Sequence, residues 1–340
     1  MTVLLPEGFT TRSATAEDAE RVSLLSNARH QVLCGDRPST PERVRQQWEH
    51  PLFDLSTDSR LVFAPDGPLV GYAQIRDIKD PPVDVFGGVT VHPDMDDAEW
   101  LWDSLLRWMD VEARRVIPKA PKQARLALVS GASANDETRQ RQLVRHAFEC
   151  SRSFHRMQID FAASDEGAHR PTPEWPEGIR VRNAVPGADD HELVTTHREA
   201  FAKHYGHLPQ PFDKDLAEWR RWMHAEDFDP RLWFLACQAE GGDIVGLCTC
   251  YEEAPGDTAY GLIDELGVRP AWRGRGIGRA LLLHAFAALA ARGLPGAVLT
   301  VDTKNRTGAT ALYESVGMRP VRVHHTYVKQ LRPGVNLVAE

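Results

Sequence analysis

The feature that most constrains the fold is a strand followed by a glycine-rich turn and a helix. The strand is predicted over 258–268 and the helix over 276–292, and the turn reads Arg273-Gly274-Arg275-Gly276-Ile277-Gly278. Glycines allow the backbone to turn tightly and to approach a ligand closely. The first helical amides have no partner within the helix and lie at the positive end of its dipole. With Arg273, Arg275 and Arg279 they predict a pyrophosphate site.

Two other phosphate-binding patterns fit this turn less well. A dinucleotide fold places G-x-G-x-x-G after the first strand of its domain, with an acidic residue about 20 residues further on. Here the turn comes late in its half of the chain, and its glycines stand at alternate positions. A Walker loop needs G-K-[ST], which does not follow Gly278. A turn of purely structural importance remains as an alternative.

The rest of the C-terminal half predicts an α/β fold with a mixed sheet. Apolar periodicity and turn residues predict two helices and a β-hairpin before the strand at 258–268, and strands then alternate with helices. Antiparallel pairing followed by this alternation gives a mixed sheet covered by helices. The predicted elements are a strand at 179–185, helices at 188–202 and 212–225, strands at 231–239, 243–251 and 297–302, a helix at 305–316 and a strand pair near 320–331.

The two halves of the chain resemble divergent copies of one unit. Residues 9–14 resemble 179–184, and residues 88–93 resemble 265–270. A polar, proline-rich stretch between the halves is typical of a linker. The sequence therefore predicts two tandem domains, with ranges of 1–161 for the first, 162–177 for the linker and 178–340 for the second.

Composition excludes several classes of protein. The chain has 340 residues and a net charge of −8, which argues against general nucleic-acid binding. No signal peptide is recognisable, and no window reaches the roughly 18 apolar residues of a membrane span. We therefore expect a cytoplasmic protein. Five scattered cysteines suit reduced thiols, and Cys248-Thr249-Cys250 lacks the second pair of a metal site, so no bound metal is expected.

The turn and the strand before it resemble the acetyl-CoA signature of the GNAT acetyltransferase superfamily. Residues 273–278 match its R/Q-x-x-G-x-G/A pattern, and Leu266-Gly267-Val268 match its preceding strand. The resemblance implies that residues 273–279 bind the pyrophosphate of acetyl-CoA and that Leu266, Gly267 and Val268 bind its pantetheine arm. It also implies that the Val268 amide faces the thioester carbonyl, where it would stabilise an oxyanion.

A second segment resembles the same family. Asn305 precedes a predicted helix whose apolar face includes Ala309, Leu312, Tyr313 and Val316. The segment is similar to N-x-x-A-x-x-L-Y-x-x-x-G-F, with Met318 at the usual aromatic position. The resemblance implies that Asn305 contacts the pantetheine and that Tyr313 protonates the departing thiolate. We also expect Asn305 to cap the helix, and packing alone is the alternative role of Tyr313.

An amine acceptor must lose a proton before it attacks a thioester, and a carboxylate can take that proton. Asp264 and Glu265 lie in the strand before the signature. Regular alternation places Asp264 on the same side as Leu266 and Val268, and Glu265 on the other. Several members of the family place their acid four residues before the position of Val268, which favours Asp264 as the base. The alternatives are Glu265, His204, Tyr205 and a water chain.

The N-terminal half lacks the cofactor pattern. The segment that corresponds to the glycine turn reads Pro93-Asp94-Met95-Asp96-Asp97-Ala98-Glu99, and its acids would repel a pyrophosphate. Leu143 stands where Tyr313 stands in the other half. We therefore predict a degenerate GNAT-like domain that keeps the fold, does not bind acetyl-CoA and acts as a structural partner.

These features predict an acetyl-CoA-dependent N-acetyltransferase that acts on a primary amine of a small molecule, by direct transfer in a ternary complex. The connection at 203–209 is expected to border the acceptor. A non-catalytic acyl-CoA-binding or scaffold protein is one alternative, and a transferase that uses aminoacyl-tRNA is another. The acidic charge and the intact turn argue against the second. The sequence agrees with a monomer and with a homodimer. It also agrees with transfer of an acetyl group or of a longer acyl group.

Overall fold

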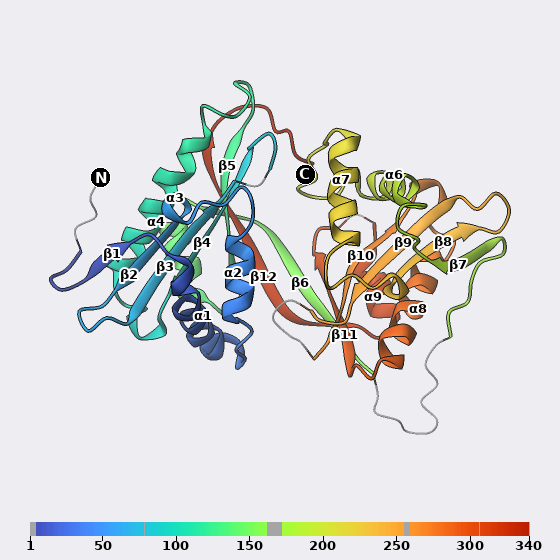
Figure 1. The fold of residues 1–340 in the computed structure, drawn as a ribbon, viewed down its shortest axis with the longest axis horizontal. Helices are drawn as coiled ribbons and strands as arrows, with labels where there is room; N and C mark the ends of the chain where they lie inside the picture. Colours follow the sequence, from blue (N-terminus) through green and yellow to red (C-terminus); the bar gives the residue numbers. More distant parts are fainter. Residues whose placement is uncertain (1–4, 78, 162–171, 255–258, 306, 340) are drawn as a thin grey trace. The chain divides into compact units, whose positions relative to one another are not determined.

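The chain folds into two compact units, each of which takes one segment from the opposite half of the sequence. The structure is a computed structural model that describes residues 5–77, 79–161, 172–254, 259–305 and 307–339. The first unit comprises Met1–Ser153 and Val323–Leu337, and the second comprises Phe154–Arg322 and Val338–Glu340 (Figure 1). Most of the predicted linker, residues 162–171, lies outside the described residues.

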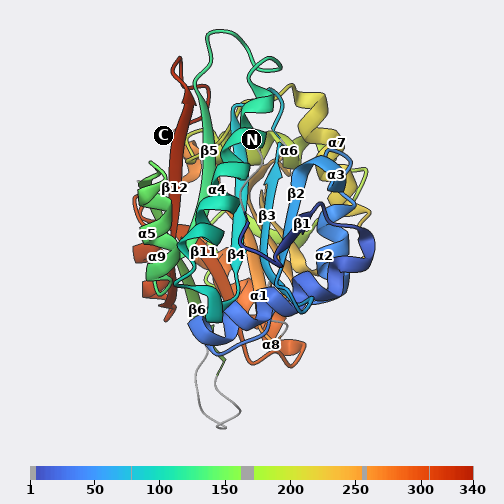
Figure 2. The same ribbon diagram turned by 90° about the vertical axis from the view of Figure 1, so that its left-hand side faces the viewer.

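The first unit is a mixed sheet with helices packed on it. Its strand order is β1-β2-β3-β4-β5-β12, which Figure 2 shows side by side. Only β4 and β5 pair in parallel among these neighbours. The strands are β1 (Thr10–Arg12), β2 (Ser59–Phe63), β3 (Leu69–Arg76), β4 (Asp84–Val91), β5 (Leu126–Ser133) and β12 (Arg319–Arg332), and the helices are α1 (Ala19–Cys34), α2 (Pro41–Trp48), α3 (Leu55–Asp58), α4 (Glu99–Ala113) and α5 (Glu137–Arg145).

The second unit repeats this arrangement with the strand order β7-β8-β9-β10-β11-β6. Here β10 and β11 are the parallel pair. The strands are β7 (Ile179–Asn183), β8 (Trp233–Gln238), β9 (Ile244–Tyr251), β10 (Gly261–Val268), β11 (Gly296–Asp302) and β6 (Glu149–Asp160), and the helices are α6 (Asp190–Phe201), α7 (Phe212–Met223), α8 (Ile277–Ala291) and α9 (Ala309–Ser315).

A shared ion pair supports the predicted duplication. The guanidinium of Arg12, at the end of β1, donates two hydrogen bonds of 2.6 and 2.7 Å to Asp18. Arg182, in β7, donates two bonds of the same lengths to Asp189, at the start of α6. Both aspartates also accept a backbone N–H just ahead of the helix, at 2.9 Å from Thr15 and 2.7 Å from Val185. The tandem mixed α/β fold is therefore confirmed.

The last strand of each unit is exchanged between the halves of the chain. Residues 324–332 of β12 pair with β5, and residues 154–160 of β6 pair with β11. The predicted strand pair near 320–331 is wrong, because this stretch is the single strand β12. The ranges predicted for the domains are contiguous, whereas the compact units are not. An exchanged strand has the same alternating pattern as an unexchanged one, so the sequence does not reveal it.

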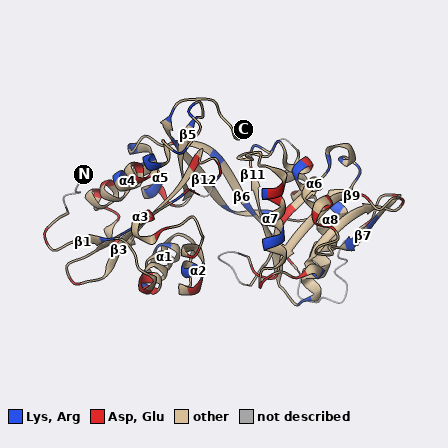
Figure 3. Cartoon of the chain, turned by 45° about the horizontal axis from the view of Figure 1, so that its top comes forward, with Lys and Arg blue, Asp and Glu red and all other residues tan. Residues whose placement is uncertain are grey.

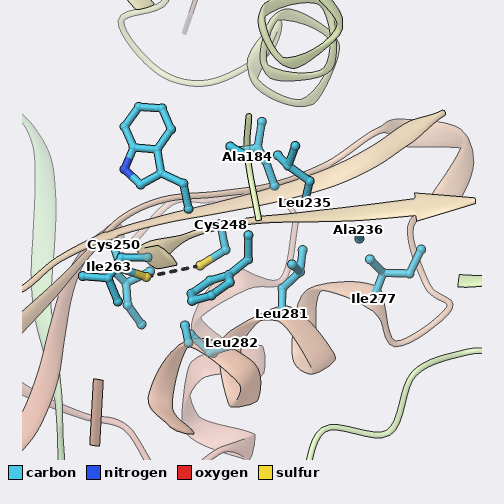
Figure 4. Close-up of a cluster of buried hydrophobic side chains, with 14 of the residues drawn as sticks. Ala184, Leu235, Ala236, Cys248, Cys250, Ile263, Ile277, Leu281 and Leu282 are labelled. Carbon is cyan, nitrogen blue, oxygen red and sulfur yellow. Dashed lines mark hydrogen bonds between the residues drawn. The ribbon is translucent and has the colours of Figure 1, made fainter. Parts of the chain in front are cut away.

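The core of the second unit lies between the sheet and α8. Leu281 and Leu282 of α8 are fully buried beneath Cys248 and Cys250 of β9, as Figure 4 shows. The two thiols lie 3.8 Å apart, and burial raises the pKa of Cys250 well above its usual value. These cysteines therefore belong to the packed core. Near the sheet edge, Gly241 and Gly242 have φ of +82° and +81°, as a tight hairpin turn requires.

Charged side chains are distributed over both units. Figure 3 shows acidic and basic residues mixed along α4 and along α7. Within the described part of the chain, no helix combines the length and the apolar character that crossing a membrane requires.

Candidate functional site

A cavity of about 580 Å³ lies within the second unit. Among the described residues, β10 pairs with β11 only at Gly261 and Leu262, so the later part of β10 is not covered by that neighbour. The cavity borders this part of β10. Its walls come from α6 and the following loop, from residues 264–268 of β10, from the glycine turn and from residues 300–313.

The glycine turn has the backbone geometry that its sequence predicts. Gly274 and Gly276 have φ of +75° and +86°, a region that glycine adopts without steric cost. Gly276 is the N-cap of α8, so the next amides begin the helix without a partner inside it. Gly278 differs, because a Cβ there would make an ordinary contact of 3.5 Å with Leu312. Two of the three glycines are therefore needed for the path of the backbone.

The three arginines of this segment have different surroundings. Arg273 donates to the carbonyl oxygens of Val268, at 3.0 Å, and Ala200, at 2.7 Å. It thereby connects the turn to β10 and to α6. Arg273 and Arg279 line the cavity, whereas Arg275 is not among the lining residues. Its guanidinium lies 4.6 Å from the centre of the Trp272 ring.

The end of β10 presents backbone amides toward the cavity side. The N–H of Arg269 donates to the carbonyl of Val245 at 2.9 Å, and hydrogen-bonded pairs alternate along an antiparallel ladder. Val268 and Leu266 therefore form the non-hydrogen-bonded pairs with β9. Their amides point away from β9, toward the side of the sheet on which β11 lies. Leu266, Gly267 and Val268 all line the cavity.

Asp264 is the additional residue of a β-bulge. Ile263 lies opposite Cys250 and Glu265 lies opposite Thr249, so Asp264 has no opposite residue of its own on β9. A bulge interrupts the alternation of side chains along a strand. Asp264 and Glu265 both line the cavity. The prediction from regular alternation, which separated the two acids, therefore does not hold at this bulge.

Asp264 has the properties of a base that works near neutral pH. Its pKa is raised to about 6, mainly because the protein atoms around the carboxylate weaken its hydration. The like charge of Glu265 raises this pKa further, and His197 acts in the opposite direction. Asp264 is an exposed residue of β10, and it lines the cavity. A carboxylate with this pKa can accept a proton at pH 7.

His197 of α6 is a site residue that the sequence analysis missed. Its Nε2 lies 3.8 Å from Oε1 of Glu265, and its ring stacks on Phe201 with 4.6 Å between centroids. Gly267 makes this approach of α6 to β10 possible, because a Cβ there would lie 2.6 Å from Phe201. The available sequence signal was the four-residue spacing of His197 and Phe201, which places both on one helix face.

Tyr313 lines the cavity from α9 and is 8% exposed. Burial raises the pKa of its hydroxyl above the usual value, which keeps the proton on the oxygen. The negative charge of Glu265 acts in the same direction. The geometry is that of a candidate proton donor at the cavity wall.

Asn305 lines the cavity but does not cap α9. The helix begins at Ala309, and its N-cap is Gly308 with φ of +77°. The predicted helix start at 305 is therefore wrong. Oδ1 of Asn305 instead accepts the backbone N–H of Thr307 at 2.7 Å, a turn that asparagine forms readily.

The loop after α6 forms part of the cavity wall. His204, Tyr205 and His207 line the cavity, whereas Lys203 does not. Burial is the main cause of a lowered pKa at His207. Two backbone hydrogen bonds hold this loop, from Gly206 to Ala339 at 2.9 Å and from Ala339 to His207 at 2.8 Å. The predicted acceptor border at 203–209 is thus in part a cavity wall.

Sequence comparisons match the part of the chain that carries this cavity. A model of the acetyltransferase (GNAT) family matches residues 192–318. A mycothiol acetyltransferase of Streptomyces griseus subsp. griseus is 33% identical over 268 residues, which cover 77% of each chain. Other mycothiol acetyltransferases match over shorter stretches, and the chain spans about half the length of these relatives (48%, 44% and 46%).

Two solved structures are similar over nearly the whole chain. A GCN5-related N-acetyltransferase from Sphaerobacter thermophilus has a TM-score of 0.83 and 32% identity, and the match covers 98% of this chain and 99% of that one. A tandem GNAT protein from the clavulanic acid biosynthesis pathway has a TM-score of 0.70 and 13% identity, with coverage of 96% and 100%. The second likeness concerns the fold alone.

Proposed function

Because the chain belongs to the GNAT family of acetyltransferases, we propose that its second unit transfers an acetyl group from acetyl-CoA to a primary amine of a small molecule. One observation carries the proposal. A single cavity joins an anion-binding helix terminus to a pair of carboxylates and to the buried Tyr313. These are the groups needed to hold a phosphate-bearing donor and to move two protons.

The residues present fit acetyl-CoA. The free amides at the start of α8, together with Arg273 and Arg279, suit its pyrophosphate. The outward amides of Leu266 and Val268 suit an extended pantetheine arm, because an unpaired strand edge binds a ligand through its backbone. Asn305 lies on the same cavity wall. When bound, acetyl-CoA supplies an activated acetyl group.

Three groups of the chain then perform direct transfer to the bound amine. Asp264 takes the proton of the attacking amine, since its raised pKa matches neutral pH. The Val268 amide donates to the thioester carbonyl oxygen as negative charge develops there. Tyr313 donates its proton to the departing sulfur. Glu265 lies beside Asp264 but is assigned no proton transfer.

We propose that the chain binds one acetyl-CoA, in the second unit. In the first unit, Asp96 of the segment that corresponds to the glycine turn pairs with Arg29 of α1. Arg29 also donates from Nε to Asp136 at 3.1 Å, and its side chain is 9% exposed. This internal ion network occupies the positive charge that a pyrophosphate would need, and Leu143 in α5 offers no hydroxyl.

Two alternatives keep specific support. Mycothiol synthase is favoured by the names of the similar mycothiol acetyltransferases. A non-catalytic acyl-CoA-binding protein would use the same turn without the acids. The acids and Tyr313 favour catalysis, and the choice of the amine separates the first alternative from the main proposal.

The test combines binding with turnover. Calorimetry with acetyl-CoA is expected to show binding, and thiol release with a panel of amines is expected to yield an N-acetyl product identified by mass spectrometry. Thiol release without amine is the control for hydrolysis. Binding of acetyl-CoA without turnover of any amine supports the non-catalytic alternative. Acetylation of the mycothiol precursor alone supports mycothiol synthase. Absence of acetyl-CoA binding overturns the proposal.

A further inference from the structure

We infer that the acceptor is a small amine with two cationic groups, of which one is acetylated and the other is held by Glu265. The inference rests on the proposed function of the same cavity. It concerns the class of acceptor, which neither the glycine turn nor the family determines.

Neither carboxylate has a Lys or Arg partner within the described residues, and the neighbour of Glu265 is His197. No hydrogen bond or ion pair from these residues reaches the Asp264 carboxylate. Glu265 lies 3.8 Å from Nε2 of His197, which exceeds hydrogen-bond distance. The Glu265 side chain is 30% exposed, so its oxygens are partly removed from water. The bulge at Asp264 is what brings two consecutive acids to one cavity.

The nearby arginines are engaged elsewhere. Arg198 of α6 pairs with Asp215 at 2.5 Å, and Arg269 lies against Thr196 at 3.1 Å. Arg273 donates to two backbone carbonyls on the side of the glycine turn. The other titratable lining residues, apart from Arg273 and Arg279, are His197, His204, Tyr205, His207, Asp302 and Tyr313. Asp264 and Glu265 therefore share the cavity without an ion pair to a Lys or Arg of the described residues.

Negative charge that no Lys or Arg neutralises costs free energy, most of all at the partly buried Glu265, and a bound cation can recover it. A monoamine can neutralise only one of the two carboxylates. During transfer, the reacting ammonium group first gives one proton to Asp264. Its nitrogen then forms a bond to the acetyl carbon, the carbon–sulfur bond breaks and Tyr313 protonates the sulfur. The second proton that the nitrogen loses restores the Tyr313 hydroxyl. Asp264 is then neutral, whereas Glu265 keeps its charge. A second ammonium group that does not react would remain paired with Glu265 throughout.

The surroundings of Glu265 suit such a group. His197, whose Nε2 lies 3.8 Å from Glu265, stacks on Phe201, and both rings line the cavity. Aromatic faces attract ammonium groups and accept an apolar stem. An acceptor with a carboxylate at this place would meet like charge and would bind poorly. The site therefore favours a diamine or a diamino sugar over an amino acid.

The test compares acceptors that differ at one end only. Thiol release is measured with 1,4-diaminobutane, with pentylamine and with 5-aminopentanoate, which carry a cation, a methyl group and an anion at corresponding places. Diaminopropane, diaminopentane and 2-deoxystreptamine vary the spacing of the two amines. The best diamine is expected to exceed the matched monoamine in kcat/KM by about tenfold or more, the usual value of a charged hydrogen bond.

Glu265→Gln assigns this preference to one side chain. The variant is expected to raise KM for the diamine and to bring the diamine-to-monoamine ratio close to one, with KM for acetyl-CoA unchanged. Glu252→Gln is the matched control, because Glu252 does not line the cavity, and it should keep the ratio.

Equal turnover of all three acceptors, or a preference that survives in Glu265→Gln, would overturn the inference while leaving the acetyltransferase proposal intact. If neither these amines nor any other amine gives thiol release, both the inference and the acetyltransferase proposal are overturned.

Discussion

The pKa of Asp264 gives the sharpest prediction for the catalytic mechanism. With a pKa of about 6, in place of the ordinary 3.8, only about one-tenth of the Asp264 side chains are ionised at pH 5. If ionised Asp264 is the base, kcat/KM at pH 5 is about tenfold below its plateau. A base with the ordinary pKa would lose almost nothing at that pH. The acid side of the profile therefore separates the two cases.

Two substitutions should move this midpoint in opposite directions. Glu265→Gln removes a like charge, so the pKa of Asp264 falls and the acid limb moves to lower pH. His197→Phe removes a group that lowers the pKa of Asp264, so the limb moves to higher pH. Weakened hydration of the carboxylate, the largest cause, remains in both variants, so neither should return the midpoint to 3.8.

The assay is initial-rate thiol release at saturating acetyl-CoA between about pH 5 and 9, the range in which a base of this kind titrates. Rates are expressed per neutral amine, so that titration of the acceptor does not enter the profile. A wild-type midpoint near 4, or a midpoint that moves in the same direction in both variants, would refute Asp264 as the base in this environment. Asp264→Asn should abolish the limb together with most of the activity.

Three further predictions concern other parts of the account. Tyr313→Phe should lower kcat about 10²-fold, as loss of a proton donor does, with KM for acetyl-CoA nearly unchanged; unchanged kcat would remove Tyr313 from the mechanism. Gly276→Ala should cost about 1–2 kcal/mol in urea unfolding, because φ is +86° there, whereas Gly278→Ala should cost less; equal losses would contradict the backbone argument. Arg29→Met should destabilise the first unit by about 3–5 kcal/mol, since the buried Asp136 loses its partner; calorimetric unfolding with an unchanged transition would contradict this.

Local features of the site were predictable from sequence. The turn at 273–278 combines a strand end, glycines and a helix start within a few residues, and each has a chemical signature of its own. Helical spacing placed Tyr313 on the apolar face of its helix, and the resemblance to the GNAT family implied its place at the cofactor site.

Features that depend on distant contacts or on one irregular residue were not predictable. The bulge at Asp264 cannot be recognised from the sequence, because the order of apolar and polar residues along the strand does not show which residue has no opposite residue on β9. The exchange of β6 and β12 depends on whether each strand pairs with β5 or with β11. Both of these strands offer the same kind of backbone hydrogen bonds, so the sequence does not decide between them. His197 was missed because its partner Glu265 is far away in the sequence.

The start of α9 shows a conflict between two local signals. Asn305 is a good capping residue, yet Gly308 takes the N-cap and Asn305 forms a separate turn. Sequence alone ranked the stronger capping residue first.

The central claim is that one acetyl-CoA binds each chain, at the turn that begins α8. Titration calorimetry of the wild-type chain with acetyl-CoA tests it most directly. Gly276→Asp should abolish the binding by placing bulk and negative charge at the helix terminus, whereas Asp97→Asn in the corresponding segment of the first unit should leave it unchanged. We predict one site per chain in the wild type and none in Gly276→Asp. Two sites per chain, or binding that survives in Gly276→Asp, would contradict the account.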